Sequence, residues 1–222
     1  MSLQVLLIEK NDLRQAESLL PQLEHQGYDV ALVDSVERAV EKTAVLWPNL
    51  IIFSPYNNQL QLSGLQEIIS KTKLNIPCIV VSKENHLKLD NTDLVVVEPD
   101  QPQQLRHEIK EITNDQKNRF IRLPELIIDC QEYQVLRHKE RHPLTPKEFK
   151  LLHLLITHQQ EVISRKAIMQ AVWETDYMGD TRTLDVHIRW LREKIEENPS
   201  QPKRLITVRG VGKTGIRSEF SL

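Results

Sequence analysis

The chain has 222 residues, of which 40% are hydrophobic and 27% are charged, and its formal net charge is −2. This length is enough for two ordinary domains, and the composition is that of a globular protein rather than a disordered one. No segment holds the ~20 apolar residues of a membrane span, and the N-terminus lacks the basic lead of an export signal. We therefore expect a cytoplasmic protein that is not inserted in a membrane.

The charge is divided unevenly along the chain. Residues 1–116 hold 10 Lys and Arg against 17 Asp and Glu, whereas residues 117–222 hold 19 against 14. Because basic side chains gain free energy by displacing counterions from phosphates, the second half favours a nucleic-acid partner. Two globular domains that differ only in charge are the alternative. Cys78 and Cys130 lie in separate apolar runs without metal-ligand spacing, so both are expected to be reduced and buried.

In the first half, short apolar runs alternate with helix-like segments. The apolar runs, at residues 3–8, 28–33, 50–53, 76–81 and 94–97, alternate little, which is typical of parallel strands buried on both faces. Helical patterns fall at residues 13–23, 35–46, 65–69 and about 103–112. This order predicts an α/β domain with a doubly wound five-stranded parallel sheet over residues 1–113. Functional side chains of such sheets lie beyond the carboxyl ends of the strands. The residues near these ends are Glu9, Lys10, Ser54, Ser82 and Glu98.

Residues 114–120 are polar and lack periodicity, so we expect a linker there and a second domain over residues 121–222. Short strand candidates at 125–130 and 133–138 precede a helix start, where Thr145, Pro146 and Glu148 form a capping-box pattern. A second helix over about 164–173 and a polar loop lead to a basic helix. Residues 205–208 and 216–220 then form a closing hairpin. This order predicts an α+β winged helix-turn-helix domain.

The basic helix is amphipathic. Its apolar residues Leu184, Ile188, Leu191 and Ile195 recur at the three- and four-residue spacing of a buried stripe. A helix about 10–12 Å across fits the major groove, where its side chains reach base edges and phosphates. The side opposite the stripe, which we predict faces DNA, carries Arg182, Thr183, Val186, Arg189, Trp190 and Lys194.

Five segments of the second half occur in a characteristic order: LTPKEFKLL, VISRKAI, VW, DTRTLDVHIRWLREKI and ITVRGVG. With these segments, and with the α/β pattern before them, the chain resembles the OmpR/PhoB-type response regulators of bacterial two-component systems. The resemblance implies a receiver-like (flavodoxin-like) domain followed by a winged-helix domain. It also implies binding to promoter repeats in double-stranded DNA. The helix from Arg182 then enters the major groove, and the wing around Arg209 and Gly210 follows the minor groove or its phosphates.

The resemblance implies further contacts. It adds His187, Arg192, Thr207 and Lys213 to the DNA-binding residues, although an interfacial role for His187 is an open alternative. The loop from Glu174 to Asp180 corresponds to a segment that can contact RNA polymerase in this family.

One residue of the recognition helix departs from the family pattern. Trp190 stands where an Arg is common on the exposed face. A tryptophan there predicts contact with a thymine methyl group or a sugar, and therefore a different sequence preference. Packing of Trp190 on a neighbouring domain is the alternative. In the wing, Lys213 replaces an aromatic residue, and we expect it to contact a phosphate.

The receiver pocket also departs from the family pattern. Receivers accept a phosphoryl group on an Asp after the third strand, with two acidic residues holding Mg²⁺, a Ser or Thr, and a Lys nearby. The segments that align with this pattern are LLIEKND, PNLIIFS, IPCIVVS and VVVEP. In this alignment the two acidic positions are occupied by Glu9 and Lys10, and the acceptor position by Ser54. The hydroxyl position is occupied by Ser82 and the Lys position by Glu98. Because phosphoryl transfer needs all these groups together, we predict no control by aspartyl phosphorylation. Lys10 and Glu98 are expected either to pair or to be solvated independently.

No enzyme, metal or cofactor is expected. The run GVGKTG lacks the first Gly of a phosphate-binding loop, because Thr207 stands there. His138 and His142 lie among basic residues, where we predict a solvated turn rather than a set of metal ligands. Control by a protein partner, a ligand, a homodimer or protein abundance would replace phosphorylation. The alternative function is a protein-interaction or ligand-sensing module with secondary DNA binding. The region after Ser82 is short, so the fourth receiver helix is expected to be reduced or absent.

Overall fold

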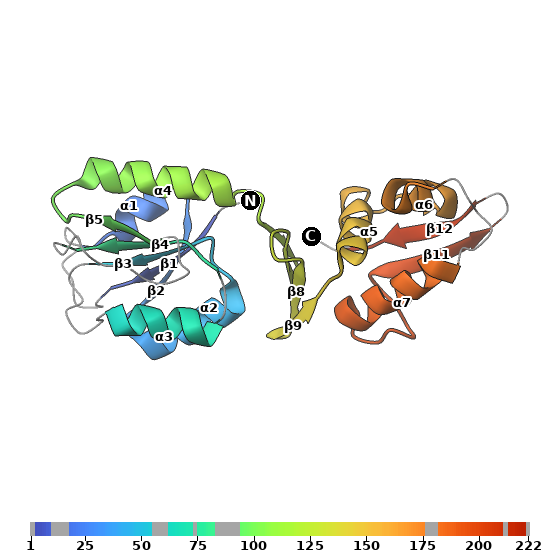
Figure 1. The fold of residues 1–222 in the computed structure, drawn as a ribbon, viewed down its shortest axis with the longest axis horizontal. Helices are drawn as coiled ribbons and strands as arrows, with labels where there is room; N and C mark the ends of the chain where they lie inside the picture. Colours follow the sequence, from blue (N-terminus) through green and yellow to red (C-terminus); the bar gives the residue numbers. More distant parts are fainter. Residues whose placement is uncertain are drawn as a thin grey trace. The chain divides into compact units, whose positions relative to one another are not determined.

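The protein is represented by a computed structural model, which describes residues 3–9, 18–54, 62–72, 75–82, 94–175, 182–210 and 213–220. The chain divides into two compact units, Met1–Arg119 and Phe120–Leu222. In Figure 1 the elements of each unit are coloured by their position along the chain. The segment at 83–93, where the fourth helix was expected to be reduced, lies outside the described residues.

The first unit contains a five-stranded parallel sheet in the order β2-β1-β3-β4-β5. Its strands are β1 (Gln4–Ile8), β2 (Asp29–Val33), β3 (Leu50–Phe53), β4 (Cys78–Val81) and β5 (Leu94–Val97). In the register, Val5 of β1 is paired with Val30 on one side and with Leu50 on the other. Strand β3 is buried throughout, because helices cover both faces of the sheet. The predicted doubly wound sheet is confirmed.

Four helices cover this sheet: α1 (Leu20–His25), α2 (Val36–Leu46), α3 (Leu62–Thr72) and α4 (Pro102–Gln116). Helices α1 and α4 lie on one face, and α2 and α3 lie on the other (Figure 1). Helix α2 begins after Ser35, whose side chain accepts a hydrogen bond from the Arg38 amide. Helix α4 continues past the predicted end near 112 to Gln116, whose carbonyl accepts a hydrogen bond from Asn49 of the same unit. Part of the segment that was expected to be a linker is therefore helical.

The second unit contains two antiparallel sheets. The first has the order β6-β7-β8-β9, with β6 (Phe120–Leu123), β7 (Leu126–Asp129), β8 (Gln134–Arg137) and β9 (Glu140–Pro143). The second has the order β10-β12-β11, with β10 (Val162–Ser164), β11 (Leu205–Gly210) and β12 (Lys213–Ser218). Strands β7, β8 and β11 were predicted, and β12 begins earlier than expected. Strands β6, β9 and β10 were missed because three or four residues carry too little periodicity.

Three helices complete this unit: α5 (Pro146–Thr157), α6 (Arg165–Trp173) and α7 (Arg182–Ile195). The predicted capping box at the start of α5 is confirmed, since Thr145 and Glu148 bond each other's backbone amide at 3.3 and 2.7 Å. The helices share one core with the sheets, to which α7 contributes its predicted stripe of Leu184, Ile188, Leu191 and Ile195. The winged helix-turn-helix fold is confirmed.

Candidate nucleic-acid interface

Helix α7 presents one face to water. Arg182, Val186, Arg189 and Trp190 are exposed, and Thr183 is half-buried at the same side of the helix. Arg189 forms an ion pair with Glu193 one turn further on, at 3.0 Å between Nε and Oε1. The structure therefore brings five of the predicted DNA-binding residues onto one surface.

The basic residues at the end of α7 are bound within the domain. Arg192 donates to the carbonyl of Leu205 at 2.6 and 3.0 Å and to Thr207 Oγ1 at 2.9 Å. Lys194 Nζ lies 2.6 Å from Glu148 Oε1, and the Glu148 side chain is only 2% exposed. The contacts of Arg192 therefore hold α7 against β11, and the contact of Lys194 holds α7 against α5. The roles of Arg192, Thr207 and Lys194 in DNA binding stay predictions.

An aromatic group supports the exposed face of α7. The ring of His187 lies between two tryptophans, with centroids 4.9 Å from Trp173 and 5.1 Å from Trp190. His187 Nδ1 is 2.8 Å from the carbonyl oxygen of Thr183, which fixes the ring along the helix. Trp173 in turn packs against the core. We name Trp173, His187 and Trp190 the aromatic support.

The predicted wing is the hairpin of β11 and β12. Arg209 is exposed near its tip, whereas residues 211–212 and the side chain of Lys213 lie outside the described residues. Gly210 pairs with Lys213 in the ladder of the hairpin. The chain after Lys213 is a strand rather than a helix, so the run GVGKTG does not have the helix that a phosphate-binding loop requires.

Two buried carboxylates that hold α7 and the loop before β11 were not identified as such from the sequence. Glu148 is visible only as part of the capping box, although it also binds Lys194 of α7. Glu196, directly after α7, accepts hydrogen bonds from the backbone amides of Lys203, Arg204 and Leu205 at 3.0, 2.8 and 2.7 Å. These hydrogen bonds fix the loop before β11, and no local sequence pattern predicts them.

The altered receiver residues lie at the carboxyl edge of the parallel sheet, in the first unit. Glu9, Ser54, Ser82 and Glu98 follow β1, β3, β4 and β5 directly. Glu9 is buried, and its carboxylate accepts hydrogen bonds from Ser18 Oγ and from the Leu19 amide. These bonds hold Glu9 against the start of α1.

The other residues of this edge differ in their surroundings. Ser54 is 5% exposed, and its Oγ makes no hydrogen bond to the part of the chain that the structure describes. Glu98 is half-buried and accepts a hydrogen bond from Gln101 at 3.1 Å. Lys10 lies outside the described residues, so its ion pair with Glu98 stays a prediction.

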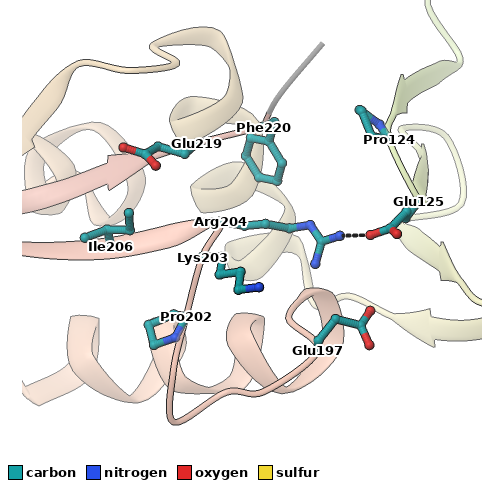
Figure 2. Close-up of a pocket in the computed structure, with 9 residues that line it drawn as sticks. All are labelled: Pro124, Glu125, Glu197, Pro202, Lys203, Arg204, Ile206, Glu219 and Phe220. Atoms are coloured by element: carbon teal, nitrogen blue, oxygen red, sulfur yellow. Dashed lines mark hydrogen bonds and ion pairs between the residues drawn. The ribbon is translucent and has the colours of Figure 1, made fainter.

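A separate open cavity of about 630 Å³ lies in the second unit (Figure 2). Arg204 reaches across it to Glu125, at 2.6 Å, and also donates to the carbonyl of Ile195. The cavity is lined by Pro124, Glu125, Glu197, Pro202, Lys203, Arg204, Ile206, Glu219 and Phe220. None of these residues was predicted as a site residue. Within the described ranges, no cluster of His, Cys, Asp and Glu could hold a metal ion.

The fold and the α7 surface define a two-domain, DNA-binding response regulator. Residues 139–212 match the family described as transcriptional regulatory protein, C terminal. The alkaline phosphatase synthesis transcriptional regulatory protein PhoP of Bacillus subtilis is 31% identical over 209 residues, or 86% of this chain and 87% of PhoP. The chain belongs to the OmpR/PhoB family of DNA-binding transcriptional response regulators.

Two further similarities cover less than half of the chain. The corresponding regulator SphR of Synechococcus elongatus is 52% identical over 82 residues, which span 37% of this chain and only 32% of SphR. The structure of the Klebsiella pneumoniae RstA DNA-binding domain in complex with the RstA box is 32% identical, with a TM-score of 0.40, and covers 46% of this chain and 97% of that one. In the described part of this chain, no helix is long and apolar enough to cross a membrane.

Proposed function

We propose that this protein is a sequence-specific transcriptional regulator whose receiver domain is not controlled by aspartyl phosphorylation. The observation that carries the proposal is Ser54, which directly follows β3, where the family has its acceptor Asp. A serine hydroxyl cannot form the acyl phosphate on which that switch depends. The hydroxyl is also buried, which hinders access of a phosphodonor.

The metal that the family's chemistry requires does not fit the described residues well. Mg²⁺ prefers carboxylate oxygens in an octahedral arrangement. Both oxygens of Glu9 already accept hydrogen bonds from Ser18 and Leu19, and Ser54 offers no carboxylate. We infer that Glu9 now has a structural role, in holding the start of α1.

The partners follow from the family and are part of the proposal. Two copies of the chain would bind promoter repeats, each with α7 in the major groove and Arg209 at the minor groove. The segment from Glu174 to Asp180 would contact RNA polymerase; most of it lies outside the described residues. A protein partner, a ligand, a homodimer or abundance would set the activity.

The test is a mobility shift with the full chain. Binding sites are first selected from random-sequence duplexes, and the dissociation constant is then measured with and without acetyl phosphate and Mg²⁺. We expect equal affinities and no stable mass increase of the protein. Ser54→Ala should behave as the wild type does. Affinity that depends on the phosphodonor, or a phosphorylated protein, would contradict phosphorylation-independent control.

A further inference from the structure

The exposed face of α7 carries two neighbouring apolar side chains, Val186 and Trp190, which we name the apolar step. Val186 and Trp190, one helical turn apart, are 40% and 44% exposed. Single exposed apolar residues are common on protein surfaces and need no explanation. Two large ones that adjoin on the proposed DNA-reading face form a surface that gains free energy when an apolar group covers it.

The Trp190 side chain is oriented before any ligand arrives. The ring of His187 packs against the Trp190 ring in a tilted arrangement, with ring centroids 5.1 Å apart and planes at 59°. His187 is itself held by the Thr183 carbonyl and by the edge of Trp173, whose ring plane is inclined at 80°. A surface that is fixed in this way loses little side-chain entropy on binding.

The neighbouring cations have other partners. Arg189 pairs with Glu193, Arg192 binds Leu205 and Thr207, and Lys194 binds the buried Glu148. To read a base edge by hydrogen bonding, Arg192 and Lys194 would have to leave these contacts, whereas Arg189 uses only its Nε in the ion pair with Glu193. The apolar step is available without any such exchange.

We propose that Trp190, together with Val186, reads thymine by its C5-methyl group, and that His187 and Trp173 are positioning residues for Trp190. In the major groove, thymine alone among the four bases presents a methyl group. The preferred site therefore has thymine at the positions that α7 covers. This inference rests on the proposed DNA binding.

The experiment changes one chemical group of the DNA. Duplexes that the full wild-type chain selects from a random library are made again with deoxyuridine at single thymine positions, which removes only the methyl group. At the positions under α7 we expect a loss of affinity of about fourfold per methyl group, the fold-change that corresponds to burying one methyl. Trp190→Ala should show a clearly smaller difference between thymine and deoxyuridine duplexes, to which only Val186 still contributes.

Two further variants separate the roles. His187→Ala should reduce the ratio of affinities for thymine and deoxyuridine duplexes, because Trp190 loses its orientation, whereas a purely structural role would leave that ratio unchanged. Arg209→Ala, in the wing, should weaken binding to both duplexes by the same factor. Thermal unfolding of each variant checks that it is folded.

The outcomes are distinct. Equal affinity of the wild type for all thymine and deoxyuridine duplexes overturns the inference, as does a thymine preference that is undiminished in Trp190→Ala. In both cases the chain still binds DNA, and the proposed function stands. If the wild type selects no DNA sequence and Trp190→Ala abolishes self-association instead, the apolar step serves a protein contact, and both the inference and the proposed function fail.

Discussion

At the scale of single residues, the buried ion pair of Glu148 and Lys194 has the largest predicted effect. Burial raises the pKa of Glu148, but hydrogen bonds from Lys194 and Thr145 more than offset this, and the pKa is lowered from its ordinary 4.5. Lys194→Ala leaves an uncompensated buried charge and should cost about 3 kcal/mol of unfolding free energy at pH 7. Urea unfolding measures this cost, with exposed Lys166→Ala as the control, for which less than about 0.5 kcal/mol is expected.

The same pair predicts a pH dependence. The folded-state pKa of Glu148 is below the unfolded value, so its stabilisation is present above about pH 4.5 and is lost as the pH falls through the folded pKa. The difference in stability between wild type and Glu148→Gln should therefore shrink below pH 4.5. A difference that stays constant between pH 7 and pH 3 would show that Glu148 does not titrate in this way.

The two cysteines should differ in reactivity. Burial and, to a smaller extent, the neighbouring Asp129 carboxylate raise the pKa of the Cys130 thiol to about 11, against the opposing effect of a hydrogen bond with the Ile121 backbone. Because the thiolate is the nucleophile, alkylation of native Cys130 by iodoacetamide should rise about tenfold per pH unit between pH 8 and 10. Peptide mass spectrometry would follow it beside the fully buried Cys78. The control is the alkylation rate of Cys130 in the urea-unfolded protein. If this rate levels off at the same pH as in the native protein, the folded surroundings do not raise the pKa of the thiol.

At the scale of secondary structure, β12 and β10 approach each other closely at Gly215. A Cβ atom there would lie 2.2 Å from the carbonyl oxygen of Ile163, a backbone atom that cannot turn away. Gly215→Ala should therefore disrupt the pairing with Ser164 and cost about 2–3 kcal/mol of unfolding free energy. Amide exchange of β10 would report the loss. Unchanged protection of the Ile163 and Ser164 region would contradict this account of the glycine.

At the scale of the whole molecule, the end of the first unit is anchored to its own sheet. Asn49 Nδ2 donates to the carbonyl of Gln116 at 3.2 Å, and Arg119 donates to the carbonyl of Asn75. A fragment 1–119 should therefore be more stable than the fragment 1–113, which the sequence pattern suggested, by about 2 kcal/mol. Thermal unfolding of the two fragments measures this difference. Equal stability would favour the shorter boundary.

The elements with a clear local sequence pattern were predictable. The four-residue apolar runs of β3 and β5, the capping box at Thr145 and the stripe of α7 each follow from a local rule. The short strands β6, β9 and β10 could not be predicted, because the pairing with their neighbours defines them. The continuation of α4 to Gln116 depends on contacts with distant residues such as Asn49, which no local pattern contains.

The sequence by itself determined the order of the longer elements, the family, the apolar and exposed faces of α7, and the serine at the acceptor position. Each of these depends on residue type and on spacing within about one element. Only the tertiary structure decided which side chains of α7 are bound inside the domain and which are presented to a ligand. Lys194 forms an ion pair with Glu148, which lies 46 positions away in the sequence, and Arg192 donates a hydrogen bond to the carbonyl of Leu205. Hydrogen bonds and buried ion pairs depend on distances that exist only after the chain has folded, so these partners could not be read from local periodicity.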